Sequence, residues 1–285
     1  MVSRRALLAG LGGSAAGAST LALGGVRPGS PSDPPATALV AGSLLAVARR
    51  VPNGTVEAHG SAAVRRLVLD GLRDPDAVAL ADPELFAGVA ARPTLFATNA
   101  LVLAYDPESP HATDLRADWR GALSDPAVRV GRTDPDTDPL GYRTVMALRL
   151  AERRGWVDAA AVLSASTLFP ETGLMNAVAG GGVDAAICYR NMAVERDLPY
   201  VDLPRAVDFS APSMADHYAT VGYDLDGRTI RGAPIRYAAA ARTDAGRAWT
   251  SALVTGADRL RTAGFGVPEE YPRETAVAGD RPGSA

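Results

Sequence analysis

Two Gly-Ser pairs are the residues of this sequence best suited to hold an anion. Gly42-Ser43 and Gly60-Ser61 each follow a strand-like stretch and precede a stretch with helical spacing. At a helix start the backbone N–H groups lack intrahelical partners and the dipole is positive, so these groups and a Ser hydroxyl can bind an anion without a basic side chain. One such Ser is simply a helix cap. Two of them, in loops that open at the same edge of a sheet, predict a site for a small oxyanion.

The third candidate feature is an acidic run at 134–143, with the sequence Asp-Pro-Asp-Thr-Asp-Pro-Leu-Gly-Tyr-Arg. Asp138 directly precedes Pro139, which is the pattern of an N-cap followed by the first residue of a helix. The spacing of the aspartates is similar to a calcium loop, but the glycine and the distant glutamate of that motif are missing. A capping role and a ligand role for Asp138 both remain open.

Alternating strands and helices must position these residues. The apolar patterns predict strands at 38–41, 55–58, 77–81, 128–131, 183–189, 200–203 and 235–241. They predict helices at 44–50, from 64 to 72, at 142–154, from 171 to 180 and at 243–260. Alternation of this kind is typical of an α/β protein whose sheets carry helices on their faces.

The chain is expected to form two lobes. The apolar run 95–105 is too long for one strand and has Asn99 in its middle, so it predicts a crossing between lobes, with a return between about 204 and 234. Lobe one would then hold residues 38–98 and 205–275, lobe two residues 99–204, and residues 276–285 would form a disordered tail. Two α/β lobes joined by more than one crossing favour a hinged binding protein.

The N-terminal segment carries an export pattern. In residues 1–26, Arg4-Arg5 precedes a weakly apolar run of Ala, Gly and Leu, which indicates a twin-arginine signal. A single transmembrane anchor is the alternative. Residues 27–37 are rich in Pro and Ser and predict a flexible spacer. We therefore expect an exported protein, extracellular or periplasmic, whose signal is either removed or kept as an anchor.

Composition argues against several other classes. The chain has 29 basic residues, all of them Arg, against 32 acidic ones, and its net charge of −3 disfavours a nucleic-acid binder. One Cys cannot form an intrachain disulfide. His59, His111 and His217 lack the spacing of a metal site. No Gly-x-Ser-x-Gly lies outside the signal, and no His neighbours a plausible nucleophile, so neither an enzyme nor a cofactor is predicted.

Three segments together resemble a known family. Residues 131–143, Phe96-Ala97-Thr98-Asn99 and Pro234-Ile235-Arg236-Tyr237 are similar to archaeal tungstate/molybdate-binding proteins of ABC importers, and the resemblance covers about residues 38–275. It implies a type II periplasmic-binding-protein fold, hinged between two parallel or mixed sheets, that closes on tungstate or molybdate and hands it to permease subunits. We expect a monomer. The alternatives are a binder of sulfate or phosphate and an exported enzyme on a similar two-lobed fold.

The resemblance also implies a ligand set, which comprises Ser43, Ser61, Asp138, Leu140, Thr172, Cys188 and Tyr189. The two Ser hydroxyls and Tyr189 would bind the oxyanion, together with backbone N–H groups near Leu140 and Thr172. Archaeal members can add two carboxylates to the metal centre. Asp138 matches the first, whereas Cys188 stands at the position of the second. We therefore expect four-coordinate binding by hydrogen bonds, with Asp138 capping its helix.

Overall fold

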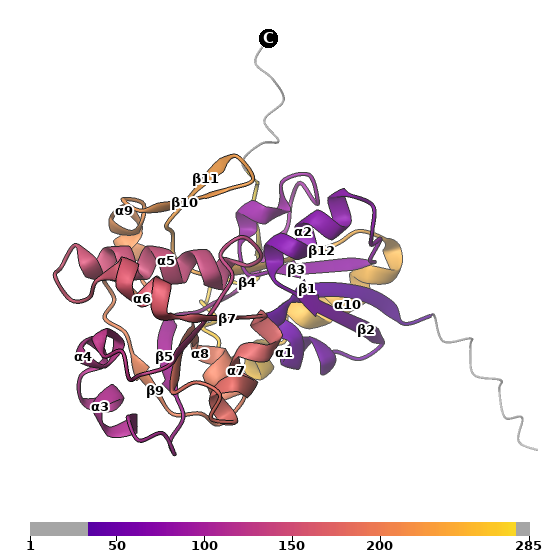
Figure 1. Ribbon diagram of the computed structural model, residues 1–285. Coiled ribbons are helices and arrows are strands. Elements are labelled where there is room, and N and C mark those ends of the chain that lie inside the picture. The colour runs from indigo at the N-terminus through magenta and orange to yellow at the C-terminus, as the bar shows by residue number, and fades with distance from the viewer. Residues whose placement is uncertain (1–33, 278–285) are drawn as a thin grey trace, which may run out of the picture. The chain divides into compact units, whose positions relative to one another are not determined.

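The computed structural model describes residues 34–277 of the chain (Figure 1). The export pattern and most of the predicted spacer lie outside the described residues, as do residues 278–285. No helix within the described part is long and apolar enough to cross a membrane.

The first sheet has six strands in the order β13-β4-β12-β3-β1-β2. Its parallel part consists of β1 (Ala36–Ala41), β2 (Gly54–His59) and β3 (Ala77–Leu80). The antiparallel part adds β4 (Thr94–Thr98), β12 (Arg236–Ala241) and β13 (Arg273–Glu274). The central strand β3 is buried at every position, as expected for a sheet that is covered on both faces.

The second sheet has five strands in the order β7-β6-β8-β5-β9. These are β5 (Leu101–Tyr105), β6 (Val130–Thr133), β7 (Thr167–Phe169), β8 (Ala185–Tyr189) and β9 (Tyr200–Asp202). β6 runs parallel to β7 and β8, whereas β5 is antiparallel to both β8 and β9. A separate hairpin joins β10 (Gly222–Leu225) to β11 (Arg228–Arg231), and sequence patterns did not predict it.

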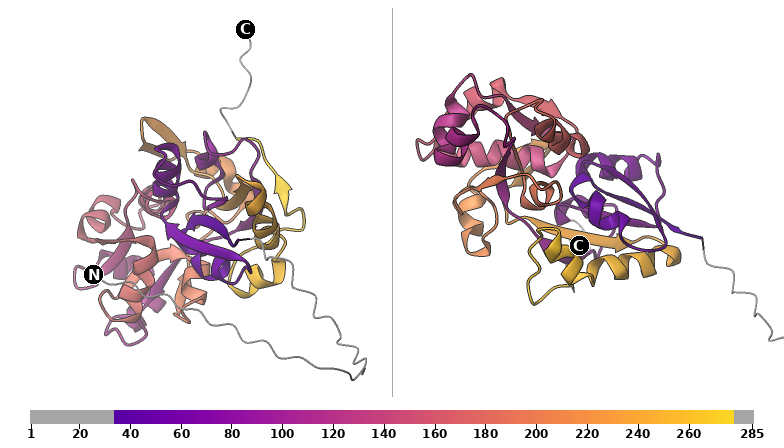
Figure 2. Two further views of the ribbon diagram at one scale, coloured as in Figure 1. Left: turned by 90° about the vertical axis from the view of Figure 1, so that its right-hand side faces the viewer. Right: turned by 90° about the horizontal axis from the view of Figure 1, so that it is seen from below.

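Helices cover these sheets, and α10 runs along strands from both ends of the chain (Figure 2). The helices are α1 (Leu45–Arg49), α2 (Ser61–Leu69), α3 (Ala112–Ala117), α4 (Trp119–Ser124), α5 (Pro139–Glu152), α6 (Ala159–Ala165), α7 (Glu171–Ala179), α8 (Arg190–Val194), α9 (Ala215–Tyr218), α10 (Asp244–Val254) and α11 (Ala257–Thr262), with short 3-10 turns η1 (Gly42–Leu44), η2 (Pro83–Phe86) and η3 (Pro212–Met214). The predicted closing helix is therefore two helices, interrupted at Gly256.

The chain passes from the first sheet to the second between Thr98 and Leu101 and returns between Asp202 and Arg236. Asn99 lies at the first passage. Its amide nitrogen donates to Asn191 Oδ1 at 2.8 Å, and its own Oδ1 accepts the Ala100 N–H at 2.9 Å. These bonds explain why a polar side chain sits inside an apolar run, because a buried amide must be hydrogen-bonded.

Two predicted boundaries differ from the structure. β1 already begins at Ala36, so the spacer predicted to run to residue 37 ends earlier, because Ala36 N–H bonds to the Asn53 carbonyl. The tail predicted from residue 276 begins too early, because Val277 is buried and its N–H donates to the Ala91 carbonyl.

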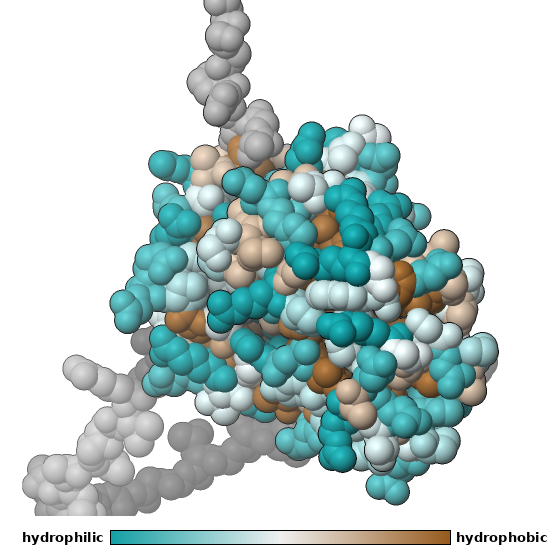
Figure 3. All heavy atoms as spheres, turned by 90° about the vertical axis from the view of Figure 1, so that its left-hand side faces the viewer, coloured by the Kyte–Doolittle hydropathy of each residue, from teal (hydrophilic) through white to brown (hydrophobic). Residues whose placement is uncertain are grey.

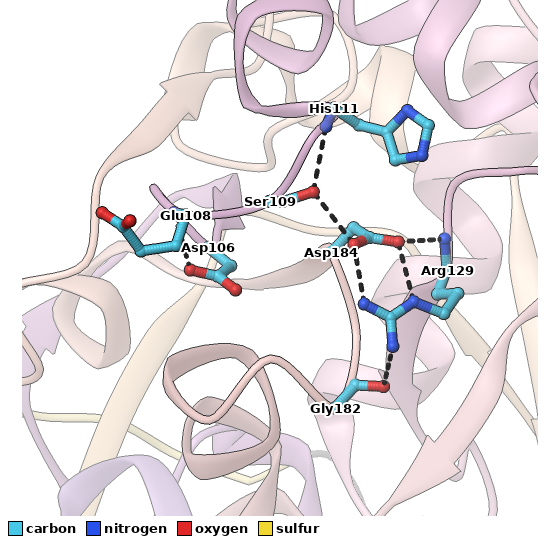
Figure 4. A network of polar contacts seen from close by, with 7 residues as sticks. All are labelled: Asp106, Glu108, Ser109, His111, Arg129, Gly182 and Asp184. Carbon is cyan, nitrogen blue, oxygen red and sulfur yellow. Dashed lines mark hydrogen bonds and ion pairs between the residues drawn. The ribbon is translucent and has the colours of Figure 1, made fainter.

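A buried carboxylate network holds the amino ends of β6 and β8 together (Figure 4). Asp184 Oδ1 accepts from Arg129 Nη2 at 2.8 Å and from the Ser109 hydroxyl at 2.9 Å, while Oδ2 accepts the Arg129 N–H at 2.7 Å. Hydrogen bonds from Arg129 lower the pKa of Asp184 to about 2. The network is structural, since Tyr189 and the candidate site lie at the opposite end of β8.

The surface on the side of α5 and α6 is mostly polar (Figure 3). Apolar side chains are scattered over that face rather than gathered, which is ordinary for a soluble domain surface.

Candidate functional site

The candidate site lies where strands of both sheets end. Ser43 follows β1, Ser61 follows β2, Asp138 follows β6, Glu171 follows β7 and Tyr189 ends β8. Because all five strands run in the parallel sense within their sheets, their carboxyl ends present these residues at one edge of each sheet.

Ser43 is buried and held from both sheets. Its Oγ accepts the hydroxyl of Tyr237, on β12, at 3.2 Å. Its carbonyl accepts the amide of Asn191, on α8, at 2.8 Å. The Ser43 turn is therefore fixed in place by neighbours of opposite sheets.

Glu171 reaches the same turn from the start of α7. Its Oε2 accepts the Gly42 N–H at 2.8 Å, and the backbone N–H and hydroxyl of Ser43 lie close enough to lower the pKa of this carboxyl group. A methyl group on Gly42 would lie 2.7 Å from Oε2, so it would fit only if the Glu171 side chain shifted. Sequence reasoning read Glu171 only as a helix opening and missed it as a site residue, because its partners are 129 positions away.

Asp138 is buried and caps α5. Its Oδ1 accepts the Gly141 N–H at 2.9 Å and the Thr133 hydroxyl at 3.0 Å. The predicted Asp-Pro helix start is confirmed.

The first turn of α2 packs against the residue before Asp138. Ala63 N–H donates to the Thr137 carbonyl at 3.0 Å. A methyl group on Gly60 would lie 2.3 Å from the Thr137 oxygen and 2.5 Å from Asp138 Cβ. The Gly60-Ser61 turn and the Asp138 loop are therefore in direct contact across the two sheets.

Ser61 is fully buried, and its Oγ accepts the Ala81 N–H at 3.0 Å. The Ala81 carbonyl in turn accepts Arg143 Nη1 at 2.8 Å. Ser61 thus supports the residue after β3 whose carbonyl accepts a hydrogen bond from Arg143, and Arg143 lies on α5.

Arg143 is the buried cation of the site. Its Nη2 lies 3.1 Å from Asp82 Oδ2, and its Nη1 donates to Tyr189 Oη at 2.7 Å. Tyr142 donates to the same Asp82 oxygen at 2.6 Å. Because Arg143 is neutralised by Asp82, it adds little free positive charge, and its role is to orient the Tyr189 hydroxyl.

Two buried carboxyl groups, those of Asp138 and Glu171, line the same cavity. Burial raises the pKa of Asp138, although its hydrogen-bond donors oppose the shift. Burial also raises the pKa of Glu171, and the neighbouring charge of Asp138 raises it further. A divalent anion entering beside both groups would be repelled unless one is protonated or moves away.

Two cavities meet at Glu171 and Thr172. One of about 210 Å³ is lined by Gly42 and Ser43, the other of about 380 Å³ by Gly60 and Asp138, and both include Glu171 and Thr172. Thr172 is exposed, so it stands at the rim rather than in the interior.

Cys188 is the residue of the predicted ligand set that directly precedes Tyr189 on β8. Cys188 is buried, but its thiol bonds to backbone groups of Ala104 and Ala193 in the interior of the second sheet. Burial raises the pKa of this thiol to about 12. Tyr189, the next residue of β8, lies on the opposite face of the strand, because successive residues of a strand point to opposite faces. The buried carboxyl group beside Asp138 belongs instead to Glu171.

Among residues 34–277, no group of three or more His, Cys, Asp or Glu side chains is arranged to hold a metal ion.

Comparison with known proteins assigns the chain to a family. Residues 52–270 match the family model described as bacterial extracellular solute-binding protein. A protein of Haloferax volcanii, whose name describes it as an ABC transporter molybdenum-binding protein, is 50% identical over 95% of this chain and 93% of its own. The molybdate/tungstate-binding protein WtpA of Thermococcus kodakarensis is 30% identical over 66% of this chain and 63% of its own.

Solved structures agree on the fold. The periplasmic molybdate-binding protein of Azotobacter vinelandii superposes with a TM-score of 0.58 at 14% identity, covering 82% of this chain and all of that one. Peb3 of Campylobacter jejuni gives 0.54 at 10% identity with the same coverage. The predicted two-sheet α/β fold of the type II periplasmic-binding proteins is thereby confirmed. The chain is a member of the bacterial extracellular solute-binding protein family.

Proposed function

We propose that this protein captures molybdate or tungstate outside the cytoplasm and delivers it to the permease of an ABC importer. The observation that carries the proposal is the buried carboxyl group of Glu171, whose Oε2 accepts the Gly42 N–H at 2.8 Å and whose pKa the neighbouring N–H and hydroxyl of Ser43 lower. A turn that holds one negatively charged oxygen in this way offers the donors that an oxyanion needs, without a basic side chain.

The names of two relatives support this choice of ligand. The Haloferax volcanii protein is named for molybdenum and the Thermococcus kodakarensis protein for molybdate and tungstate. Their matches cover 95% and 66% of this chain, respectively. The family consists of solute-binding proteins, so a transport component rather than an enzyme is expected.

The ligand set that we propose consists of the hydroxyls of Ser43, Ser61 and Tyr189 with backbone N–H groups near Leu140 and Thr172. Tyr189 suits this role because its oxygen already accepts from Arg143, which leaves its own hydrogen free to be donated to an anion. Asp138 keeps its place as the N-cap of α5, and the oxyanion stays four-coordinate.

For location and partners we propose export through the paired Arg4-Arg5 signal, a monomeric protein, and docking on permease subunits. Export of the folded chain would leave the binding site ready to sample solutes outside the membrane.

Calorimetric titration with molybdate, tungstate, sulfate and phosphate tests the function. We expect molybdate and tungstate to bind with similar affinity, since they are nearly the same size, and the smaller sulfate to bind more weakly. Stronger binding of sulfate or phosphate would assign the site to another oxyanion. No binding of any of the four would reject the receptor function.

X-ray absorption on the tungstate complex tests the coordination. We expect a first shell of four oxygen atoms. Six oxygens, or a sulfur neighbour, would show that protein side chains bind the metal directly.

A further inference from the structure

We propose that Glu171 is a built-in substitute for the oxyanion: its carboxyl group uses the donors of the Gly42–Ser43 turn, so an incoming oxyanion must displace it. The inference rests on the proposed function, because it assumes that the ligand binds at this turn. It adds a residue that sets the affinity by competing for the site rather than by contacting the ligand.

The donors of the turn cannot serve both groups. Gly42 has one N–H, and it already donates to Glu171 Oε2 at 2.8 Å. The Ser43 hydroxyl has one hydrogen, its oxygen already accepts from Tyr237, and it lies close enough to Glu171 to lower the pKa of that carboxyl group. An oxyanion that took these bonds would leave Glu171 buried without partners, which is costly for a charged group.

Glu171 is only partly satisfied where it lies. Within the described residues its second oxygen, Oε1, is buried without a hydrogen-bond partner, and the Glu171 side chain is 4% exposed. Asp138, the other buried carboxyl group, lines the same cavity, and its negative charge disfavours the charged form of Glu171. Once another anion accepts from these donors, the buried conformation of Glu171 is therefore less stable than one that exposes its carboxyl group.

There is also space for it to leave. Glu171 lines both cavities, and its neighbour Thr172 is exposed at their rim. Rotation of the side chain toward the larger cavity would take the carboxyl group away from Gly42 and toward solvent.

The same contact links the two sheets. Glu171 begins α7, which packs on the second sheet, while its donors follow β1 of the first sheet. Holding the Gly42–Ser43 turn thus also keeps the two sheets together, and the oxyanion must replace this link as well as the hydrogen bonds.

The test compares Glu171→Ala and Glu171→Gln with the wild-type chain in calorimetric titrations with sodium molybdate at pH 9. Glu152→Gln is the matched control: it removes the same charge from an exposed carboxylate that accepts one backbone N–H, from Ala159, away from the cavities. We expect Glu171→Ala to bind molybdate about tenfold tighter or more, the size of a lost competing bond to a charged group. Glu171→Gln should be intermediate and Glu152→Gln unchanged.

The outcomes separate this inference from the proposed function. Weaker binding by Glu171→Ala would mean that Glu171 contacts the ligand. Unchanged binding would mean that Glu171 does not compete with the ligand. Either result overturns the inference, although the wild type still binds molybdate. If neither the wild type nor any variant binds molybdate or tungstate, the proposed function fails and the inference with it. Should Glu171→Ala be unfolded by circular dichroism, the Glu171→Gln titration decides alone, and tighter binding is again required.

Discussion

Gly42 and Glu171 are joined across the two sheets by a hydrogen bond of 2.8 Å between the Gly42 N–H and Glu171 Oε2. The bond places a carboxyl oxygen where a bound oxyanion would find its donors. A methyl group in place of the Gly42 hydrogen would lie 2.7 Å from Oε2, so this hydrogen bond leaves no room for a side chain unless Glu171 moves.

Ser43→Ala and Ser61→Ala should each weaken molybdate binding by about 1–3 kcal/mol, because a buried oxyanion oxygen loses a hydroxyl donor. Calorimetry measures the loss, and Ser124→Ala, at an exposed position outside the site, is the matched control. If both variants bind like the wild type, the ligand lies elsewhere.

Gly60→Ala should prevent the close contact between the α2 turn and the Asp138 loop. Its new methyl group would meet the Thr137 carbonyl, which is backbone and cannot swing away, so we expect a destabilisation of about 1–3 kcal/mol in urea unfolding. Gly173→Ala is the control, because its methyl group would find only Pro170 at 3.9 Å inside a helix. Equal stability of the two variants would mean that this contact is not maintained in solution.

The Asp184 network predicts acid sensitivity. The pKa of Asp184 is about 2 in the folded chain against 3.8 ordinarily, so its contribution of about 2 kcal/mol is complete above pH 4. It is lost as the pH falls from about 4 toward 2, because the unfolded chain then binds the proton more readily. Urea unfolding of the wild type and of Asp184→Asn across this range checks it. The difference between the two should shrink at low pH, and a constant difference would contradict the assignment.

The buried position of Cys188 predicts opposite effects for two substitutions. Cys188→Ala should leave molybdate affinity unchanged, since the thiol lies in the interior of the second sheet. Cys188→Glu should lower the thermal midpoint strongly, because it buries a carboxylate among apolar neighbours. A folded Cys188→Glu protein that binds tungstate more tightly would show that this position faces the ligand after all.

Local features of the site were predictable from the sequence. The Gly-Ser turns, the Asp138–Pro139 helix start and the alternation of strands and helices depend on residues within a few positions of one another. The chain's own preferences are strong there, since strands need apolar runs and helix starts need capping groups. The passage between the sheets at Asn99 was also predictable, because Asn99 is a polar residue inside an apolar run.

Tertiary structure decided which side chains meet at the site. Glu171 joins Gly42 over 129 positions, and Arg143 meets Asp82 over 61, distances at which no spacing rule applies. Tyr189 lies on the face of β8 that meets Arg143, and Cys188 lies on the opposite face. Which residue lies on which face depends on how this strand pairs with β5 and β6. Burial, which raises the pKa of Glu171 and Asp138, exists only once both sheets pack together. The sequence therefore determined the local donors, whereas long-range packing determined which carboxyl group they hold.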